Sequence, residues 1–258
     1  MDHRIGIEAF DCRIAVVSNC ARTLANLDRF LFPSLPRIAP DVPGADIVLR
    51  VLRQGDGFQL TCGDRSEPAR DFTALVSEAV RQLDDGIVKR LTNLTAVHAG
   101  TVELHGKALL LPGKSHVGKS ALVAELLRRG AVYFSDEYAL IDERGRAHPY
   151  PRPLLVRNGG AEQVPVLPEE CNARVGDRPV PVGWILALEY GPAASWRIAA
   201  VPQSEALLIL LRNTPHELQE APRILPALSR AASGSCCYTG QRNGAPEAAE
   251  QILRLVAG

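Results

Sequence analysis

The sequence predicts a mixed α/β fold, with an α/β core that follows a smaller N-terminal α+β region. Residues 107–112 are apolar enough for a buried strand, a glycine-bearing turn follows them, and residues 119–129 have helical spacing and end at Gly130. Short apolar segments over 131–134 and 138–142 then predict two more strands. Units of strand, loop, helix and strand build α/β sheets. We therefore expect an N-terminal α+β region over 1–92 and an α/β domain over 93–258.

The N-terminal region shows alternating and helical patterns but no chemical motif. The expected elements are a strand or hairpin over 5–17, a helix over 21–32, two strands over 45–53 and 57–62, and a helix capped by Asp71 that runs to about residue 91. Four prolines between 33 and 43 enforce an extended connector. A purely structural layer is favoured here over a docking or oligomerisation surface.

The second region contains further strands and three terminal helices. The expected elements are strands over 96–103 and 107–111, an irregular stretch over 148–181, paired strands over 184–190 and 196–201, and helices over 203–211, 222–232 and 246–256. Trp184 and Trp196 lie on expected strands, so we assign them to the core rather than to a shelf for a nucleotide base.

The composition excludes several classes of protein. The 258 residues carry 29 basic and 29 acidic side chains, whereas binding to nucleic acid or an anionic membrane by bulk charge needs a basic surplus. No apolar run approaches the roughly 18 residues of a membrane span, and the N-terminus lacks the pattern of a signal peptide. Six cysteines without CxxC spacing favour reduced thiols over a zinc site. We expect a cytoplasmic protein without nucleic-acid or membrane partners.

Residues 113–120 read GKSHVGKS and match the phosphate-binding pattern GxxxxGK[ST]. Glycines let successive backbone N–H groups turn toward phosphate oxygens, and the following helix presents its positive end to the same anion. The lysine supplies a mobile charge for the β- and γ-phosphates, and the serine hydroxyl can ligate Mg²⁺. The alternative is a glycine turn without a ligand, which the flanking strand and helix disfavour. The expected nucleotide-binding residues are Gly113, Lys114, Ser115, His116, Val117, Gly118, Lys119, Ser120 and Ala121.

Two acids complete this pattern. Asp136 and Glu137 follow the next expected strand, and ligands bind at the carboxyl ends of parallel strands in open α/β sheets. In isolation such a pair reads as a helix cap or a solvated turn, but coupled to the phosphate loop it predicts metal binding and proton transfer. Within the loop, Lys114 and His116 either touch the γ-phosphate or the acceptor, or lie at a solvated tip.

These residues resemble HPr kinase/phosphorylase, a bacterial protein-serine kinase whose phosphate loop is related to that of phosphoenolpyruvate carboxykinase. The resemblance is carried by a histidine–glycine strand start, the phosphate loop, a helix that ends in Arg-Gly and paired acids, which stand at 98–100, 113–120, 127–130 and 135–137. It extends to HPr-kinase-like bacterial proteins with the pattern HAG…LLLPG…GKS…RGA…SDE…HPYPRP, some of which accompany ribosomal peptide pathways, lasso peptides included.

The resemblance implies a role for each matching residue. Asp136 takes the place of the acid that accepts the proton of the substrate hydroxyl, and Glu137 stands where a second acid lies near the metal with Ser120 and Asp136. His98 matches an active-site histidine, although by the sequence alone a hydrogen-bonded strand residue is the alternative. Arg152 and Arg157 are candidates for phosphate or substrate contacts, although the prolines around Arg152 are also typical of a rigid connector.

The sequence departs from the family pattern in the phosphate loop and at a later signature. These departures bear on the second metal ligand, the reverse phosphorolysis reaction and the HPr substrate. The loop has Lys114 where the family has an acid and His116 where it has glycine. The counterpart of a Glu-x-Arg-Gly signature is the segment 155–158, which reads LVRN and lacks both the glutamate and the glycine.

The sequence therefore favours an ATP- and Mg²⁺-dependent kinase that transfers the γ-phosphoryl group to a hydroxyl, with a serine of a peptide or protein as the preferred acceptor. The alternatives are a nucleotide-binding regulatory or partner module, an NTPase with little transfer activity, and a kinase of small-molecule hydroxyls. The resemblance implies a homo-oligomer. The acceptor and the nucleotide base have no sequence signature.

Overall fold

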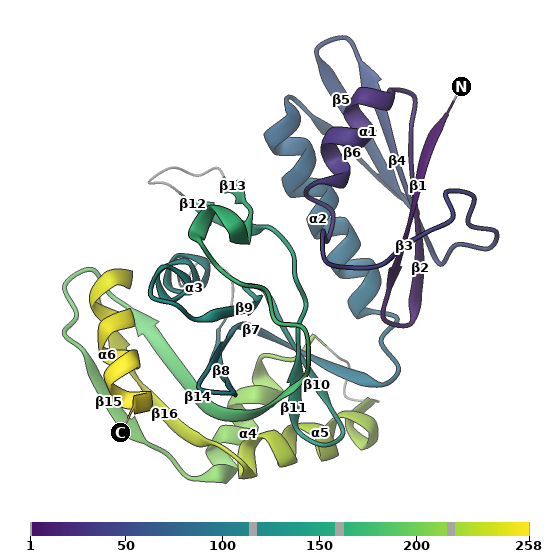
Figure 1. Ribbon diagram of the computed structural model, residues 1–258. Coiled ribbons are helices and arrows are strands. Elements are labelled where there is room, and N and C mark those ends of the chain that lie inside the picture. Colours follow the sequence, from purple (N-terminus) through teal and green to yellow (C-terminus); the bar gives the residue numbers. More distant parts are fainter. Residues whose placement is uncertain (1, 114–117, 158–162, 216–219, 258) are drawn as a thin grey trace. The chain divides into compact units, whose positions relative to one another are not determined.

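The chain folds into two compact units. The computed structural model describes residues 2–113, 118–157, 163–215 and 220–257 (Figure 1). The first unit comprises residues 1–92 with 151–167, and the second comprises 93–150 with 168–258. Segment 151–167 thus groups with the first unit, whereas the sequence analysis assigned it to the second region. The chain is a mixed α/β protein, as the sequence predicts.

The first unit is built on a six-stranded sheet in the order β3-β1-β2-β4-β5-β6. Its strands are β1 (His3–Ala9), β2 (Cys12–Ser18), β3 (Arg37–Ile38), β4 (Ile47–Gln54), β5 (Gly57–Cys62) and β6 (Arg65–Ala69). The segment 5–17, predicted as a strand or a hairpin, forms the hairpin β1–β2, and the two strands predicted over 45–53 and 57–62 form the hairpin β4–β5. Strand β6 was not predicted, because its residues RSEPA are polar and it joins the sheet edge through its pairing with β5.

Two helices and a hairpin complete the first unit. Helix α1 (Ala21–Asp28) packs against β1 and β2, and α2 (Phe72–Val88) packs against β4, β5 and β6. The carboxylate of Asp71 caps α2 by accepting a hydrogen bond from the backbone N–H of Ala74 at 2.8 Å, as predicted. Strands β12 (Leu154–Arg157) and β13 (Gln163–Val166) form a hairpin against α2. The expectation of an irregular stretch over 148–181 is therefore wrong in this part.

The second unit is built on an eight-stranded sheet. Its strands are β7 (Leu94–Leu104), β8 (Lys107–Pro112), β9 (Val132–Ser135), β10 (Tyr138–Asp142), β11 (Arg146–His148), β14 (Val180–Tyr190), β15 (Arg197–Ala200) and β16 (Cys236–Arg242). The order is β11-β10-β7-β8-β14-β16-β15, with β9 beside β7 and a further pairing of β11 with β14. Strands β8, β14 and β16 are mutually parallel.

The pairing predicted for 184–190 with 196–201 is wrong. Strand β15 pairs with β16, which lies between it and β14. Strand β16 was not predicted, because its residues CCYTGQR lack an apolar alternation. A strand of this kind is stabilised by neighbours on both sides rather than by its own pattern.

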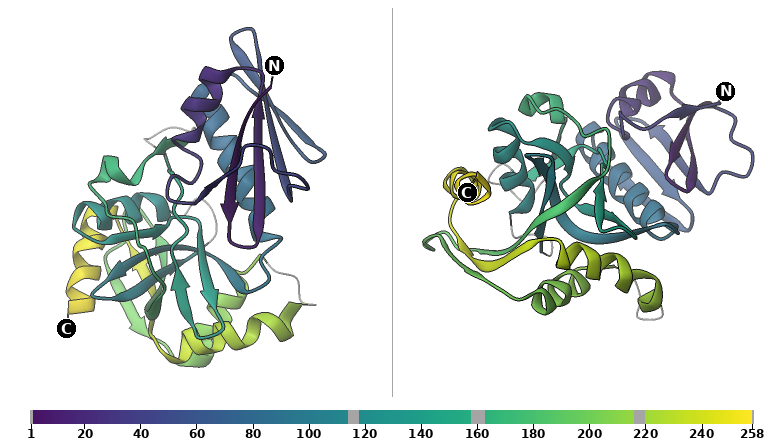
Figure 2. Two further views of the ribbon diagram at one scale, coloured as in Figure 1. Left: turned by 45° about the vertical axis from the view of Figure 1, so that its right-hand side comes forward. Right: turned by 60° about the horizontal axis from the view of Figure 1, so that its bottom comes forward.

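Helices cover both faces of this sheet (Figures 1 and 2). Helices α3 (Lys119–Arg128) and α6 (Ala245–Ala257) pack together on one face, and α4 (Gln203–Arg212) and α5 (Ala221–Ser233) pack together on the other. A short 3₁₀ helix, η1 (Pro168–Cys171), lies against α3. In the parts of the chain that the structure describes, no helix is long and apolar enough to cross a membrane.

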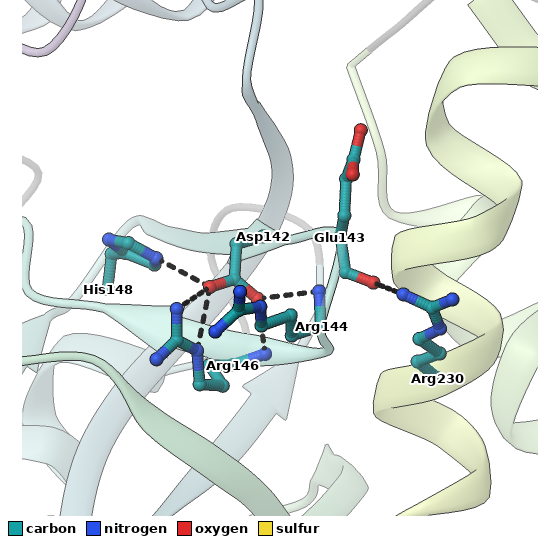
Figure 3. A network of polar contacts seen from close by, with 6 residues as sticks. All are labelled: Asp142, Glu143, Arg144, Arg146, His148 and Arg230. Carbon is teal, nitrogen blue, oxygen red and sulfur yellow. Dashed lines mark hydrogen bonds and ion pairs between the residues drawn. The ribbon is translucent and has the colours of Figure 1, made fainter.

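A polar network ties the turn between β10 and β11 (Figure 3). The carboxylate of Asp142 accepts hydrogen bonds from the backbone N–H groups of Arg144 and Arg146 at 2.9 Å each and from the Arg146 guanidinium at 2.9 Å. Its second oxygen lies 3.0 Å from Nε2 of His148. Burial by itself raises the pKa of Asp142, but these hydrogen bonds outweigh it and hold the pKa below 3.8. The ionised carboxylate therefore stabilises this hairpin.

Replacement of that carboxylate should destabilise the protein in a pH-dependent way. Asp142→Asn should lower the free energy of unfolding by about 2 kcal/mol at neutral pH, because the new amide group faces donors. The contribution of a carboxylate with a lowered pKa is present above its unfolded-state pKa and is lost as pH falls through its folded-state pKa. In urea unfolding, the difference in free energy of unfolding between wild type and Asp142→Asn should thus become smaller below pH 3.8. Glu143→Gln, an exposed neighbour, is the control, and a gap independent of pH would contradict this role.

Candidate functional site

The predicted site is organised around the centre of β7. The backbone carbonyl of His98 accepts a hydrogen bond from the N–H of Gly113 at 3.2 Å, so the glycine-rich segment leaves β8 beside this residue. On the other edge of β7, the N–H of Ala99 donates to the carbonyl of Glu137 at 3.0 Å. Segments about 25 residues apart along the chain are thereby held on either side of one strand.

The two acids lie between β9 and β10, which both pair with β7. Ser135 pairs with Thr101 and Tyr138 pairs with His98 in the same antiparallel register, and Asp136 and Glu137 come between them. The hydroxyl of Ser135 accepts hydrogen bonds from the N–H groups of Glu137 at 3.3 Å and Tyr138 at 3.1 Å. Strands β8 and β9 are both antiparallel to β7 and hence run in the same direction, so their carboxyl ends point the same way.

The two carboxylates have different surroundings. Asp136 is fully buried, and the hydroxyl of Tyr133 donates a hydrogen bond to its Oδ1 at 3.3 Å. The Glu137 side chain is partly exposed, with its Oε1 3.4 Å from Nδ1 of His98. The His98 ring lies on the ring of Tyr138, with 4.5 Å between the centroids. The structure therefore brings together three of the predicted residues, His98, Asp136 and Glu137, and adds Tyr133 as a buried partner.

Lys119 is a buried cation at the start of α3. Its side chain is buried, and Nζ donates a hydrogen bond to the carbonyl of Gly113 at 2.6 Å. Burial lowers the pKa of Lys119, while the carboxylates of Glu137 and Asp136 act in the opposite direction. The lysine of the GK[ST] motif thus lies within electrostatic reach of both acids. A poorly hydrated ammonium group in this position is suited to a multiply charged anion.

An arginine that the sequence analysis missed holds the start of α3. Gly118 has φ +73°, and its carbonyl accepts hydrogen bonds from the N–H of Leu122 at 3.2 Å and from Nη2 of Arg242 at 3.1 Å. Arg242 is buried, and its Nη1 donates to the carbonyl of Asn243 at 2.9 Å. Burial lowers its pKa, against the opposite effect of Tyr190. No sequence signal reveals this contact, because Arg242 lies 124 residues from Gly118.

The other predicted nucleotide-binding residues fall into two groups. Ser120 and Ala121 lie in the first turn of α3, half-buried and exposed respectively. Lys114, Ser115, His116 and Val117 lie outside the described residues.

The two predicted arginines belong to the first unit. Arg152 is fully buried there, with its Nε 3.0 Å from a carboxylate oxygen of Asp84. An arginine in such an ion pair is part of a buried core rather than an exposed phosphate ligand. Arg157 ends β12, and the structure describes its backbone but not its side chain.

The oxygen donors fit a magnesium ion in kind. Mg²⁺ takes oxygen ligands, commonly one or two carboxylates with water and substrate phosphates, and Asp136, Glu137 and the Ser120 hydroxyl offer that set. No group of three or more His, Cys, Asp or Glu side chains forms a metal cage within the described part of the chain.

Comparison with known proteins shows a partial similarity. No family model matches the chain. It is 29% identical over 117 residues to HPr kinase/phosphorylase from Shouchella clausii, which is 45% of this chain and 37% of that protein. It is also 29% identical over 103 residues to HPr kinase/phosphorylase from Geobacillus kaustophilus, covering 40% of this chain and 33% of that protein. The match spans about a third of these relatives' length. The predicted resemblance to HPr kinase/phosphorylase is thus confirmed for this part of the chain.

The chain is also similar to a solved structure. It is the Hpr(Ser) kinase/phosphatase from Coxiella burnetii, with a TM-score of 0.34 and 15% identity over 63% of this chain and 95% of that chain.

A methyl group at Gly118 should disturb the start of α3. A Cβ there would lie 2.8 Å from Nη2 of Arg242, and the positive φ is unfavourable for any residue with a side chain. Gly118→Ala should therefore lower the free energy of unfolding by about 1–2 kcal/mol. Gly106→Ala, at a turn where φ is +76° and no atom lies within 4 Å, tests the backbone cost alone. Urea unfolding should show a larger loss for Gly118→Ala, and equal losses would contradict the steric contact.

Proposed function

We propose that this protein is an ATP- and Mg²⁺-dependent kinase that transfers the γ-phosphoryl group of ATP to a hydroxyl, with a serine of a peptide or protein as its acceptor. One observation carries the proposal. A buried lysine from a GxxxxGK[ST] motif lies within electrostatic reach of a buried aspartate and a neighbouring glutamate. Phosphoryl transfer needs positioning and charge neutralisation, and these groups supply both.

The nucleotide phosphates are bound by residues 113–120 and the N-terminal turn of α3. Lys119 exchanges the carbonyl of Gly113 for phosphate oxygens, which its long side chain permits without movement of the helix. The contact of Arg242 with the Gly118 carbonyl keeps the helix start in place. Ser120 and the acids Asp136 and Glu137 would hold Mg²⁺, which would neutralise the charge that develops on the phosphates.

The transfer step uses Asp136 as the proton acceptor. The acceptor hydroxyl oxygen forms a bond to the γ-phosphorus, and the bond from that phosphorus to the oxygen bridging it to the β-phosphate breaks. ADP leaves with the electron pair of that bond, and the hydroxyl proton passes to Asp136. Tyr133 holds one carboxylate oxygen of this acid, and His98 orients Glu137.

The acceptor assignment depends on the similarity to proteins named HPr kinase/phosphorylase. A peptide or protein serine agrees with that similarity, and a small-molecule hydroxyl is the second acceptor class. A regulatory module or a simple NTPase is the alternative for a chain that carries LVRN at 155–158. We also infer a cytoplasmic homo-oligomer, on the same resemblance.

Lys119 gives a test of nucleotide binding. Lys119→Ala should weaken the binding of Mg-ATP about a hundredfold, because a buried cation aimed at the phosphates is removed. Calorimetric titration with Mg-ATP measures this, with Lys89→Ala, an exposed lysine of the first unit, as the control. Unchanged affinity in Lys119→Ala would show that residues 113–120 do not bind the nucleotide.

Asp136 gives a test of transfer. Asp136→Asn keeps the shape of the side chain and should leave the affinity for metal-free ATP unchanged, while phosphoryl transfer falls about 10²–10⁴-fold. Incubation with γ-labelled ATP and serine-containing peptides measures the label on the acceptor. Asp177→Asn, an exposed acid of the same unit, is the control. Wild-type transfer by Asp136→Asn would remove this residue as the base, and release of free phosphate alone by the wild type would support an NTPase.

A further inference from the structure

Tyr190 is an exposed aromatic residue at the carboxyl end of β14, an inner strand of the sheet. It ends β14, pairs in register with Arg242 at the end of β16, and is 49% exposed. The guanidinium carbon of Arg242 lies 5.1 Å from the centre of its ring. Because β8, β14 and β16 are parallel, their carboxyl ends lie at the same end of the sheet. Residues 113–120 follow the carboxyl end of β8. Tyr190 therefore stands on the strand adjacent to the one that feeds the predicted phosphate loop.

Tyr190 lies on the same face of the sheet as Lys119. Side chains alternate along a strand, so Leu186, Leu188 and Tyr190 share one face of β14. Leu186 and Leu188 line a cavity of about 10 Å³ together with Lys119 and Arg242. Continued by one alternation, this row places Tyr190 beyond the cavity, at the carboxyl end of β14.

Arg242 links this ring to the start of α3. Two of its nitrogens donate to backbone carbonyls, Nη2 to Gly118 and Nη1 to Asn243, and the residue is 3% exposed. A guanidinium whose N–H edges are engaged in this way presents its flat face to a ring. The pair is thus rigid on its inner side, while the tyrosine remains accessible to solvent.

We propose that the Tyr190 ring, supported by Arg242, is the stacking platform for the base of the nucleotide whose phosphates bind at residues 113–120. This proposal rests on the function proposed above and adds the subsite for the base. An accessible ring next to a phosphate site suits a planar base, because every base has a π face that stacks on an aromatic side chain. The pairing of Ile185 with Leu110 puts Tyr190 two residues beyond the level of Gly113 on the neighbouring strand. With about 4.8 Å between strands and about 3.3 Å per residue, the backbones of Tyr190 and Gly113 are roughly 8 Å apart, which a nucleoside can span.

The position of Trp184 favours Tyr190 for this role. Trp184 lies six residues before Tyr190 on β14, and it pairs with Leu109 rather than with the end of β8. Its ring contacts Lys107, whose Nζ is 5.9 Å from the ring centre and which begins β8. Trp184 therefore lies toward the opposite end of the strand, away from the edge at which residues 113–120 leave the sheet.

The test compares a ligand that has a base with one that has none. Mg-ATP and Mg-tripolyphosphate should be titrated calorimetrically into wild type, Tyr190→Ala and Tyr190→Phe. Tyr190→Ala should weaken ATP binding about tenfold and leave tripolyphosphate binding unchanged, because one base–aromatic stack is lost. Tyr190→Phe should retain wild-type affinity for both ligands. Leu208→Ala is the matched control, because Leu208 of α4 is 48% exposed, and thermal unfolding checks that each variant is folded.

The outcomes separate this proposal from the function on which it rests. Equal ATP affinities in wild type and Tyr190→Ala would overturn the platform and leave the phosphate site intact. Parallel losses of ATP and tripolyphosphate binding in Tyr190→Ala would also overturn it, since they indicate a general effect on the loop. A wild-type protein that binds neither ligand would overturn the proposed function and the platform together.

Discussion

The hydrogen bonds of His98 and Ala99 at the centre of β7 hold the whole candidate site. The carbonyl of His98 accepts a hydrogen bond from the N–H of Gly113, at the start of the glycine-rich segment, and the N–H of Ala99 donates one to the carbonyl of Glu137. A β-strand interior is among the most rigid parts of a protein, because its backbone groups are paired on both edges. The site therefore has a stiff backbone at its centre, while the reacting groups extend from the segments on either side.

Burial of charge is the second constraint. Lys119 and Asp136 are both removed from water, and each isolated charge would be costly in that environment. The cation is stabilised by the Gly113 carbonyl and by the two acids, and Tyr133 donates a hydrogen bond to Asp136. Such a constellation is already desolvated, so its electrostatic effect on a bound anion is stronger than it would be at an exposed surface.

The local elements of the site were predictable from the sequence. The strand over 107–112, the helix that begins at Lys119 and the acids after the next strand were found because their signals span a few neighbouring residues. Glycine spacing and apolar runs report local backbone requirements, which a single sequence displays directly. The predicted roles of Lys114 and His116 stay predictions, because both lie outside the described residues.

The phosphate-loop motif, the strands and helix around it and the resemblance to HPr kinase/phosphorylase could all be recognised in the amino-acid sequence. Three features became visible only in the folded chain: β16 lies between β14 and β15, Arg242 contacts Gly118, and Arg152 is buried in the first unit against Asp84. The physical reason is the separation along the chain. A contact across 124 residues depends on how strands are ordered in the sheet, and that order is set by packing over the whole unit rather than by any local pattern.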